Sequence, residues 1–294
     1  MERKQLSMLM VAMLLSGLLM LAFVPDSICM HLVLPASAED SFNVVVEPSD
    51  KPSAIQGDQN DSSAVFHVEV IREDVIPPSY IGRKVLIYHT HTYEAYEQVE
   101  GNPYKQTERW RTKDADHNVI AVGKALAASL RAMGIEVFHD VTAFEPPTLD
   151  DAYERSLAML EERKASGETY DLYIDLHRDA IASTSTIKKT VNISGEDVAR
   201  FMVLVGQGTT GGYAEKPDWE KNLKIAQRIT DCLNSQCASL ARDVKIKTGR
   251  FNQHISNGCI LIECGMNTNT LDEVLAGVPY LAQAIAETLA GLSE

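Results

Sequence analysis

The chain has 294 residues, which is enough for one or two domains, and 45% of them are hydrophobic, so it can bury a sizeable core. Its formal net charge is −14. This charge argues against a general nucleic-acid binder, because phosphate binding needs clustered lysine and arginine side chains.

The N-terminus carries the signals of an exported protein. Arg3 and Lys4 precede an uncharged apolar run that ends at Val24. The pattern is typical of a signal sequence or signal anchor, and an apolar run of roughly 20 residues can also span a bilayer. Ala36-Ser37-Ala38 offers a cleavage site. We therefore predict that residues 1–38 are a signal peptide or membrane anchor, and that the rest lies outside the cytoplasm, either membrane-anchored or secreted.

Residues 39–80 have the composition of a tether. They are rich in Pro, Ser, Gly, Asp and Asn and show no periodicity, so they cannot bury enough surface to fold alone. A short edge strand is predicted at 65–71. The catalytic domain is expected at residues 81–294.

From residue 84 onward, strand and helix patterns alternate. Strands are predicted at 84–89, 135–140, 170–179, 199–206 and 258–265, and helices at 118–134, 149–167, 218–240 and 269–292. Alternation requires crossover connections, so we expect an α/β fold with a mostly parallel twisted sheet and helices on both faces. In such folds the ligand site lies beyond the carboxyl ends of the strands.

Ionisable side chains stand at the ends of three predicted strands. His89 and His91 follow the first strand, His177 lies near the end of 170–179, and Glu263 lies near the end of 258–265. Each follows a run of apolar β-formers. Three strands that deliver such groups to one edge of a sheet indicate an active site.

The residue types at these ends suit a catalytic zinc ion. Such sites use three protein ligands and leave a position for water, and two histidines with one glutamate form a known set. His91, Glu94 and His177 supply that set, as an H-x-x-E motif plus a distant histidine. Zn²⁺ makes hydroxide available near neutral pH for attack on an amide carbonyl, and Glu263 is placed to take and return the proton.

Some of these roles have rivals in the sequence. Side chains at i and i+2 share a face of an extended chain, so His89 can replace His91 as the ligand, support the ligands from behind, or contact substrate. Asp114, just before a helix, competes with Glu94 as the third ligand. His89, Arg178 and His254 are the candidates for stabilising the oxyanion or contacting substrate.

The spacing of the cysteines does not indicate a metal-binding site. None of the five has zinc-finger spacing to another. A free cysteine behaves mostly as a small apolar residue. We expect buried or free thiols at Cys232, Cys237, Cys259 and Cys264.

Several stretches together resemble the stage II sporulation protein P family. They include "VLIYHTHTYEAY", "YIDLHRDA", "RFNQHIS" and "LIECGMNTNTLDE", and the resemblance covers roughly residues 80–292. It implies a zinc amidase-like fold of the amidase type 3 or carboxypeptidase kind, with a Zn²⁺ site. The histidines and glutamates of the family motifs fall on His89, His91, Glu94, His177 and Glu263.

The resemblance also implies an activity and partners. The reaction is cleavage of the N-acetylmuramoyl-L-alanine amide of peptidoglycan, with a second, endopeptidase activity on peptide cross-links. The partners are stage II sporulation proteins D and M, during engulfment of the forespore. The acidic charge indicates no simple attraction to polyanionic wall polymers, so a partner is expected to help recruit the protein.

Two other functions remain open from the residues. The H-x-x-E spacing also suits an exported metallo-carboxypeptidase or another peptide amidase. A protein of another class, an anchored wall-binding scaffold with a structural metal, is the third hypothesis. The products released from cell-wall material discriminate among them.

Overall fold

The computed structural model describes residues 32–33, 43–45, 69–71 and 79–293. Chain contacts divide the protein into two units, Met1–Ile76 and Pro77–Glu294. Most of the predicted leader, with Cys29, and most of the tether lie outside the described residues, and both assignments stay predictions. No helix among the described residues is long and apolar enough to cross a membrane.

The first unit contributes a small antiparallel sheet. Its order is β1-β2-β3, and β3 falls within the predicted strand at 65–71. The strands are β1 (Leu32–Val33), β2 (Asn43–Val45) and β3 (Glu69–Ile71).

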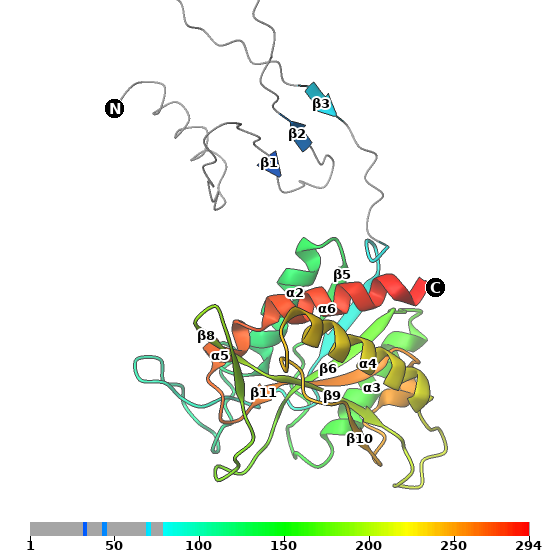
Figure 1. Ribbon diagram of the computed structural model, residues 1–294. Coiled ribbons are helices and arrows are strands. Elements are labelled where there is room, and N and C mark those ends of the chain that lie inside the picture. Colours follow the sequence, from blue (N-terminus) through cyan, green and yellow to red (C-terminus); the bar gives the residue numbers. More distant parts are fainter. Residues whose placement is uncertain (1–31, 34–42, 46–68, 72–78, 294) are drawn as a thin grey trace, which may run out of the picture. The chain divides into compact units, whose positions relative to one another are not determined.

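The second unit is built on a six-stranded sheet of order β10-β9-β11-β6-β4-β5 (Figure 1). Its strands are β4 (Lys84–Tyr88), β5 (Glu136–His139), β6 (Leu172–Asp179), β9 (Phe201–Gly206), β10 (Lys245–Lys247) and β11 (Cys259–Met266). The helices are α2 (Val119–Ala132), α3 (Ala152–Ala165), α4 (Trp219–Gln236), α5 (Leu271–Leu275) and α6 (Val278–Ala290), with short 3₁₀ turns η1 (Gln253–Ile255) and η2 (Gly291–Ser293). A separate hairpin joins β7 (Thr190–Ile193) to β8 (Glu196–Ala199).

The sheet is mostly parallel, which confirms the predicted fold class. β5, β4, β6 and β11 run in one direction, while β9 and β10 run in the other, so β9 pairs with β11 antiparallel. The reversal follows from the connections. The chain passes from β6 to β9 through the β7–β8 hairpin, without the crossover helix that a parallel arrangement needs.

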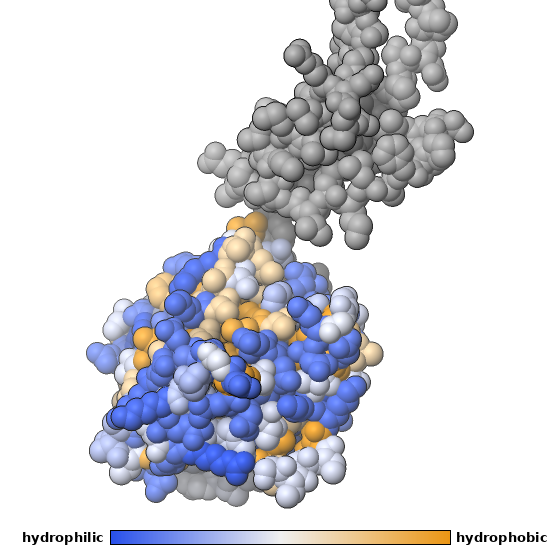
Figure 2. All heavy atoms as spheres, turned by 90° about the vertical axis from the view of Figure 1, so that its left-hand side faces the viewer, coloured by the Kyte–Doolittle hydropathy of each residue, from blue (hydrophilic) through white to orange (hydrophobic). Residues whose placement is uncertain are grey.

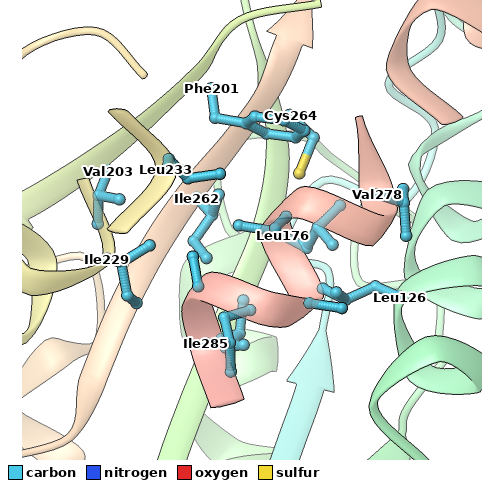
Figure 3. Packing of buried hydrophobic residues seen from close by; sticks show 14 of the residues in the cluster. Leu126, Leu176, Phe201, Val203, Ile229, Leu233, Ile262, Cys264, Val278 and Ile285 are labelled. Atoms are coloured by element: carbon cyan, nitrogen blue, oxygen red, sulfur yellow. The ribbon is translucent and has the colours of Figure 1, made fainter. Parts of the chain in front are cut away.

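The two faces of the sheet carry different cores. One face packs against α2, α4 and α6 through residues such as Leu176, Phe201 and Ile262 (Figure 3). The opposite face packs a smaller cluster, which includes Tyr88 and Tyr173, against Leu160 of α3. Side chains alternate across a strand, so each strand contributes to both cores. Helices therefore lie on both faces, as predicted.

Three elements differ from the sequence-based expectation, and one of them is the edge strand β10, which was not predicted. The predicted helix at 269–292 is two helices, α5 and α6, separated at Gly277, and α6 begins with a proline in its first turn. A Cβ atom on Gly277 would lie 2.6 Å from the Phe201 ring, so the residue must be small. The β7–β8 hairpin was not predicted. Ser194-Gly195, both at positive φ, is the two-residue turn signal that identifies it.

The four cysteines of the described unit are free thiols, which confirms that prediction, and Cys259 and Cys264 are buried. One side of the unit appears in Figure 2. Its surface is mostly hydrophilic, with hydrophobic residues in several smaller groups.

Candidate active site

A short turn after β4 brings His91 and Glu94 together. The backbone N–H of Glu94 donates to the carbonyl of His91 at 3.4 Å. The chain is then tied to the start of α2, because Val119 N–H donates to the Glu94 carbonyl at 2.9 Å. Glu94 is therefore held at the sheet edge, and the residue is 8% exposed.

His177 and Glu263 come from neighbouring parallel strands in the centre of the sheet. They are direct register partners of the β6–β11 pair, so their side chains lie on the same face. Asp175, two residues before His177, also lies on that face. The intervening Leu176 points into the large core on the other side. Alternation along β6 thus separates the ionisable side chains from the apolar ones.

A bulge follows Glu263 in β11. The register with β6 shifts between Glu263 and Met266. Gly265 has φ +71, and a Cβ atom there would lie 2.7 Å from a methyl carbon of Val274. Only glycine suits this position. Bulges of this kind redirect side chains beside active sites.

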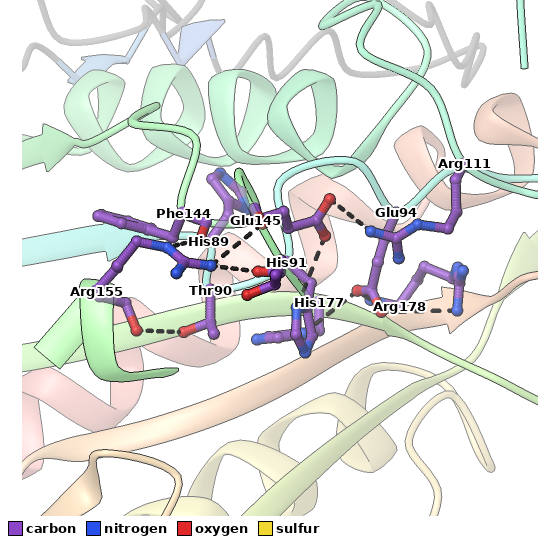
Figure 4. A network of polar contacts seen from close by, with 12 residues as sticks. His89, Thr90, His91, Glu94, Arg111, Phe144, Glu145, Arg155, His177 and Arg178 are labelled. Carbon is purple, nitrogen blue, oxygen red and sulfur yellow. Dashed lines mark hydrogen bonds and ion pairs between the residues drawn. The ribbon is translucent and has the colours of Figure 1, made fainter. Parts of the chain in front are cut away.

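Figure 4 shows how the side chains gather around His177. The His91 and His177 rings meet edge to face with centroids 5.2 Å apart. Glu94 Oε2 lies 3.3 Å from His177 Nδ1, and Asp175 Oδ1 lies 2.8 Å from His177 Nε2. Residues far apart in the sequence therefore meet at one edge of the sheet.

The two carboxylates control the charge of His177. Burial alone would lower its pKa, but Asp175 and Glu94 outweigh burial and raise the pKa well above its ordinary value. Burial alone would raise the pKa of Glu94, whereas hydrogen bonding and charge from His177, with help from Arg178, bring it to about 2. The structure thus favours an imidazolium between two carboxylates.

Glu263 has a different environment. It is 8% exposed, and its Oε2 atom has no hydrogen-bond partner. Burial raises the pKa of Glu263 to about 7, and Glu94 and Asp179 add to the effect. A carboxyl group that titrates near neutral pH can both accept and return a proton.

The donors have the chemistry of a zinc site without being arranged as one. In the described part of the chain, no group of three or more His, Cys, Asp and Glu side chains is positioned to hold a metal ion. The ring nitrogens of His177 both face carboxylates. His91 Nδ1 is nevertheless buried without a hydrogen-bond partner, while His177 Nε2 faces the Asp175 carboxylate at 2.8 Å. Two imidazole nitrogens beside a carboxylate fit Zn²⁺, provided that the side chains reorient and His177 releases its proton.

His89 lies beneath this cluster and not within it. Its side chain is fully buried; Nδ1 lies 2.9 Å from the Leu176 carbonyl and Nε2 lies 2.8 Å from His139 Nε2. Burial and the neighbouring His139 lower its pKa to about 3. A Cβ atom on Gly123 would lie 2.7 Å from His89 Nε2, so α2 packs directly onto the ring. This position suits neither a ligand nor a substrate contact.

Of three further sequence candidates, Arg178 contacts the cluster, because its guanidinium lies 3.7 Å from Glu94 Oε1. Arg178 is 6% exposed and donates to the backbone carbonyls of Ala95 and Trp110, so it supports the loop after Glu94. Asp114 is exposed and pairs with His117 at 2.8 Å. His254 is half-buried in η1, and no contact among the described residues joins it to His177. Of the two rival carboxylates, Glu94 is therefore the one beside His177.

Sequence reasoning missed three residues at the site. Asp175 was detectable, because it shares a strand face with His177 at a spacing of two. Glu145 has no sequence signal; it is 5% exposed, lies 3.6 Å from His91 Nδ1, and forms an ion pair with Arg111. Tyr153 of α3 contacts the His91 ring edge to face, with centroids 5.5 Å apart.

The fold and the site together define an α/β protein with two histidines and two glutamates gathered at one edge of a mostly parallel sheet. The model of the stage II sporulation protein P family matches residues 38–286. The chain belongs to that family. It is similar to stage II sporulation protein P of Bacillus subtilis (strain 168), with 25% identity in an alignment 214 residues long that covers 69% of this chain and 50% of the relative. The chain thus spans about half the length of the curated relative it matches.

Solved structures of amidases are also similar to this chain. N-acetylmuramoyl-L-alanine amidase AmiC2 of Nostoc punctiforme has 16% identity and a TM-score of 0.43, over 72% of this chain and 97% of that one. The CwlD amidase from Clostridioides difficile, solved in complex with the GerS lipoprotein, has 14% identity and a TM-score of 0.42, over 72% and 97%. At these values the likeness carries no argument about activity.

Proposed function

We propose that this chain is a zinc-dependent peptidoglycan hydrolase that cleaves the N-acetylmuramoyl-L-alanine amide during sporulation. The observation that carries the proposal is the cluster of His91, Glu94 and His177 beside the buried carboxyl group of Glu263. Membership of the stage II sporulation protein P family supports sporulation as the setting. Engulfment as the stage and cell-wall material as the substrate are part of the proposal. Cleavage of peptide cross-links would use the same chemistry.

In this proposal His91, Glu94 and His177 hold the zinc ion. A bound Zn²⁺ supplies a nucleophilic water near neutral pH and polarises the amide carbonyl. Asp175 fixes the orientation of the His177 ring. Carboxylates that support metal-binding histidines typically have this role.

Glu263 serves as the general base and then as the general acid. It accepts a proton from the attacking water and returns it to the nitrogen of the departing amine. Its unpartnered Oε2 atom is free to bind that proton. The low exposure of Glu263 excludes bulk water, which would otherwise compete for the proton.

We further propose that the catalytic domain works outside the cytoplasm, held by the N-terminal apolar segment or secreted. Stage II sporulation proteins D and M are the proposed partners. The net charge of −14 supports a need for recruitment, because the wall polymers are polyanionic.

Product analysis on purified peptidoglycan, with and without a chelator, tests the reaction. A new muramic-acid terminus with a free alanine amine supports the amidase. A released terminal amino acid supports a carboxypeptidase, and an opened cross-link supports an endopeptidase. Wall binding without any new amine, with zinc supplied, supports the scaffold.

Glu263→Gln tests the base. The variant should retain zinc and lose turnover by a factor on the order of 10²–10⁴, because an amide cannot accept the proton. Full activity in this variant would remove Glu263 from the mechanism.

His177→Ala tests the ligand assignment. We expect loss of zinc by elemental analysis. Asp114→Ala is the matched control and should keep its zinc, since Asp114 is exposed and away from the cluster. Zinc loss in Asp114→Ala, combined with retention in Glu94→Ala, would reverse the choice of carboxylate ligand.

A further inference from the structure

A cavity of about 340 Å³ lies beside the N-terminal turn of α3, and the chemistry described above does not use it. Three aromatic rings line it, from Tyr153, Tyr213 and Phe251. Its polar lining includes Asp150, Arg250 and Asn252. The volume falls in the range of small-molecule sites in proteins.

Tyr153 joins this cavity to the proposed active site. The Tyr153 ring contacts the His91 ring, at a centroid distance of 5.5 Å, and the Phe251 ring, at 5.8 Å. The same side chain thus borders both sites. The cavity therefore lies one aromatic side chain away from His91.

The loop that carries Phe251 is held in an uncommon conformation. Phe251 and Asn252 have φ values of 50 and 53, in the left-handed region that non-glycine residues rarely occupy. The Asn252 amide donates to the Tyr153 carbonyl at 2.8 Å and to Ser156 Oγ at 3.0 Å, which locks the loop onto α3. Strain of this kind gathers at ligand-binding sites, where the surrounding contacts maintain it.

Contacts within the protein already hold the Arg250 side chain in place. Its guanidinium lies 4.2 Å from the centroid of the Tyr213 ring and donates to the Glu215 carbonyl. Stacking leaves the rest of the planar group available as a fork of donors. Nearby, Asp150 and Glu154 provide acceptors at the same cavity.

This lining matches the chemistry of a pyranose ring. A sugar presents an apolar face of C–H groups, which packs on aromatic rings, and a rim of hydroxyl and acetamido groups, which bind planar donors and acceptors. An acidic peptide fits less well, because the two carboxylates of Asp150 and Glu154 oppose the single Arg250. Charge therefore favours a neutral ligand.

We propose that this cavity binds an N-acetylated sugar of the glycan strand, next to the bond to be cleaved. The inference rests on the proposed function and names the part of the substrate that this subsite takes. It assigns Tyr213 and Arg250 to substrate binding, without a role in the chemical step.

Calorimetry with a β-1,4-linked tetramer of N-acetylglucosamine tests the assignment on the full chain. This probe has no peptide and no scissile amide. We expect the wild type to bind it and Tyr213→Ala to bind at least 10-fold more weakly. Tyr213→Phe, which keeps the ring, should bind within about 3-fold of the wild type. Phe138→Ala is the control, because Phe138 is 38% exposed against 36% for Tyr213 but lies outside the cavity.

Two outcomes would overturn the proposal. One is no binding of the tetramer by the wild type, or equal binding by Tyr213→Ala. The other is binding of a free stem tetrapeptide that Tyr213→Ala abolishes. Glu263→Gln should bind the tetramer like the wild type. Wild-type protein that binds the tetramer but hydrolyses no peptidoglycan would refute the proposed reaction and leave the subsite standing.

Discussion

The same strands place apolar side chains on one face of the central sheet and ionisable side chains on the other. On one face, Leu176 and Ile262 are fully buried in a dry core with α2, α4 and α6. On the other, the adjacent residues Asp175, His177 and Glu263 form a buried polar cluster, which α3 borders through Tyr153, beside the His91 ring. The first face stabilises the fold. The second places ionisable groups where burial costs free energy.

The comparison shows why the site is accurately positioned. Asp175 and Glu263 each lie between two neighbours in the large core, and His177 follows one, Leu176. Movement of His177 or Glu263 would therefore disturb close-packed side chains on the opposite face. The apolar face stabilises the fold, and its close packing also fixes the positions of the side chains on the polar face.

The largest expected effect comes from breaking the apolar face. Leu176→Ala should lower the free energy of unfolding by about 2–5 kcal/mol, because it leaves a cavity in a core with no exposed surface. Denaturant unfolding measures the change. Leu149→Ala, at an exposed position, should change it little. A loss below about 1 kcal/mol for Leu176→Ala would mean that this core is not closely packed.

The second-largest expected effect is a gain in stability, and it comes from a substitution on the polar face. In folded, metal-free protein the pKa of Glu263 is raised to about 7 from an ordinary value of 4.5. Folding therefore favours the protonated form, and stability falls as pH rises between these values. Glu263→Gln should be more stable than the wild type at pH 8, by up to about 3 kcal/mol, with the gain disappearing near pH 4.

Thermal or denaturant unfolding across this pH range, with a chelator present, measures that gain. Glu136→Gln replaces an exposed carboxylate that pairs with Lys84 and is the control; it should show no such trend. A destabilised Glu263→Gln at pH 8 would contradict the claim that the buried carboxyl costs free energy when ionised.

The smallest expected effect concerns the support of His177. Asp175→Asn keeps the size of the side chain but removes its charge, so zinc affinity should fall about 10–100-fold. Metal titration against a competing chelator gives the value. Asp171→Asn, near the start of the same strand, should leave the affinity unchanged. Equal losses in both variants would point to general destabilisation of β6.

Much of this arrangement could be predicted from the sequence. Runs of apolar residues located the strands, and the carboxyl-end rule placed His91, His177 and Glu263 on one edge. Local patterning could not orient His89, because its burial depends on how closely α2 approaches at Gly123. Glu145 and Tyr153 reach the site from elements with no motif of their own. Tertiary packing alone brings them there.

The reversed direction of β9 has a consequence for variation within the family. The segment between β6 and β9 contains a hairpin and no crossover helix, so its length can change without altering the order of strands. It leaves β6 just after His177 and Arg178. Insertions at this point would build a new lobe beside the His177 end of β6, where the proposed hydrolase could gain contacts with its substrate while the centre of the sheet stays intact.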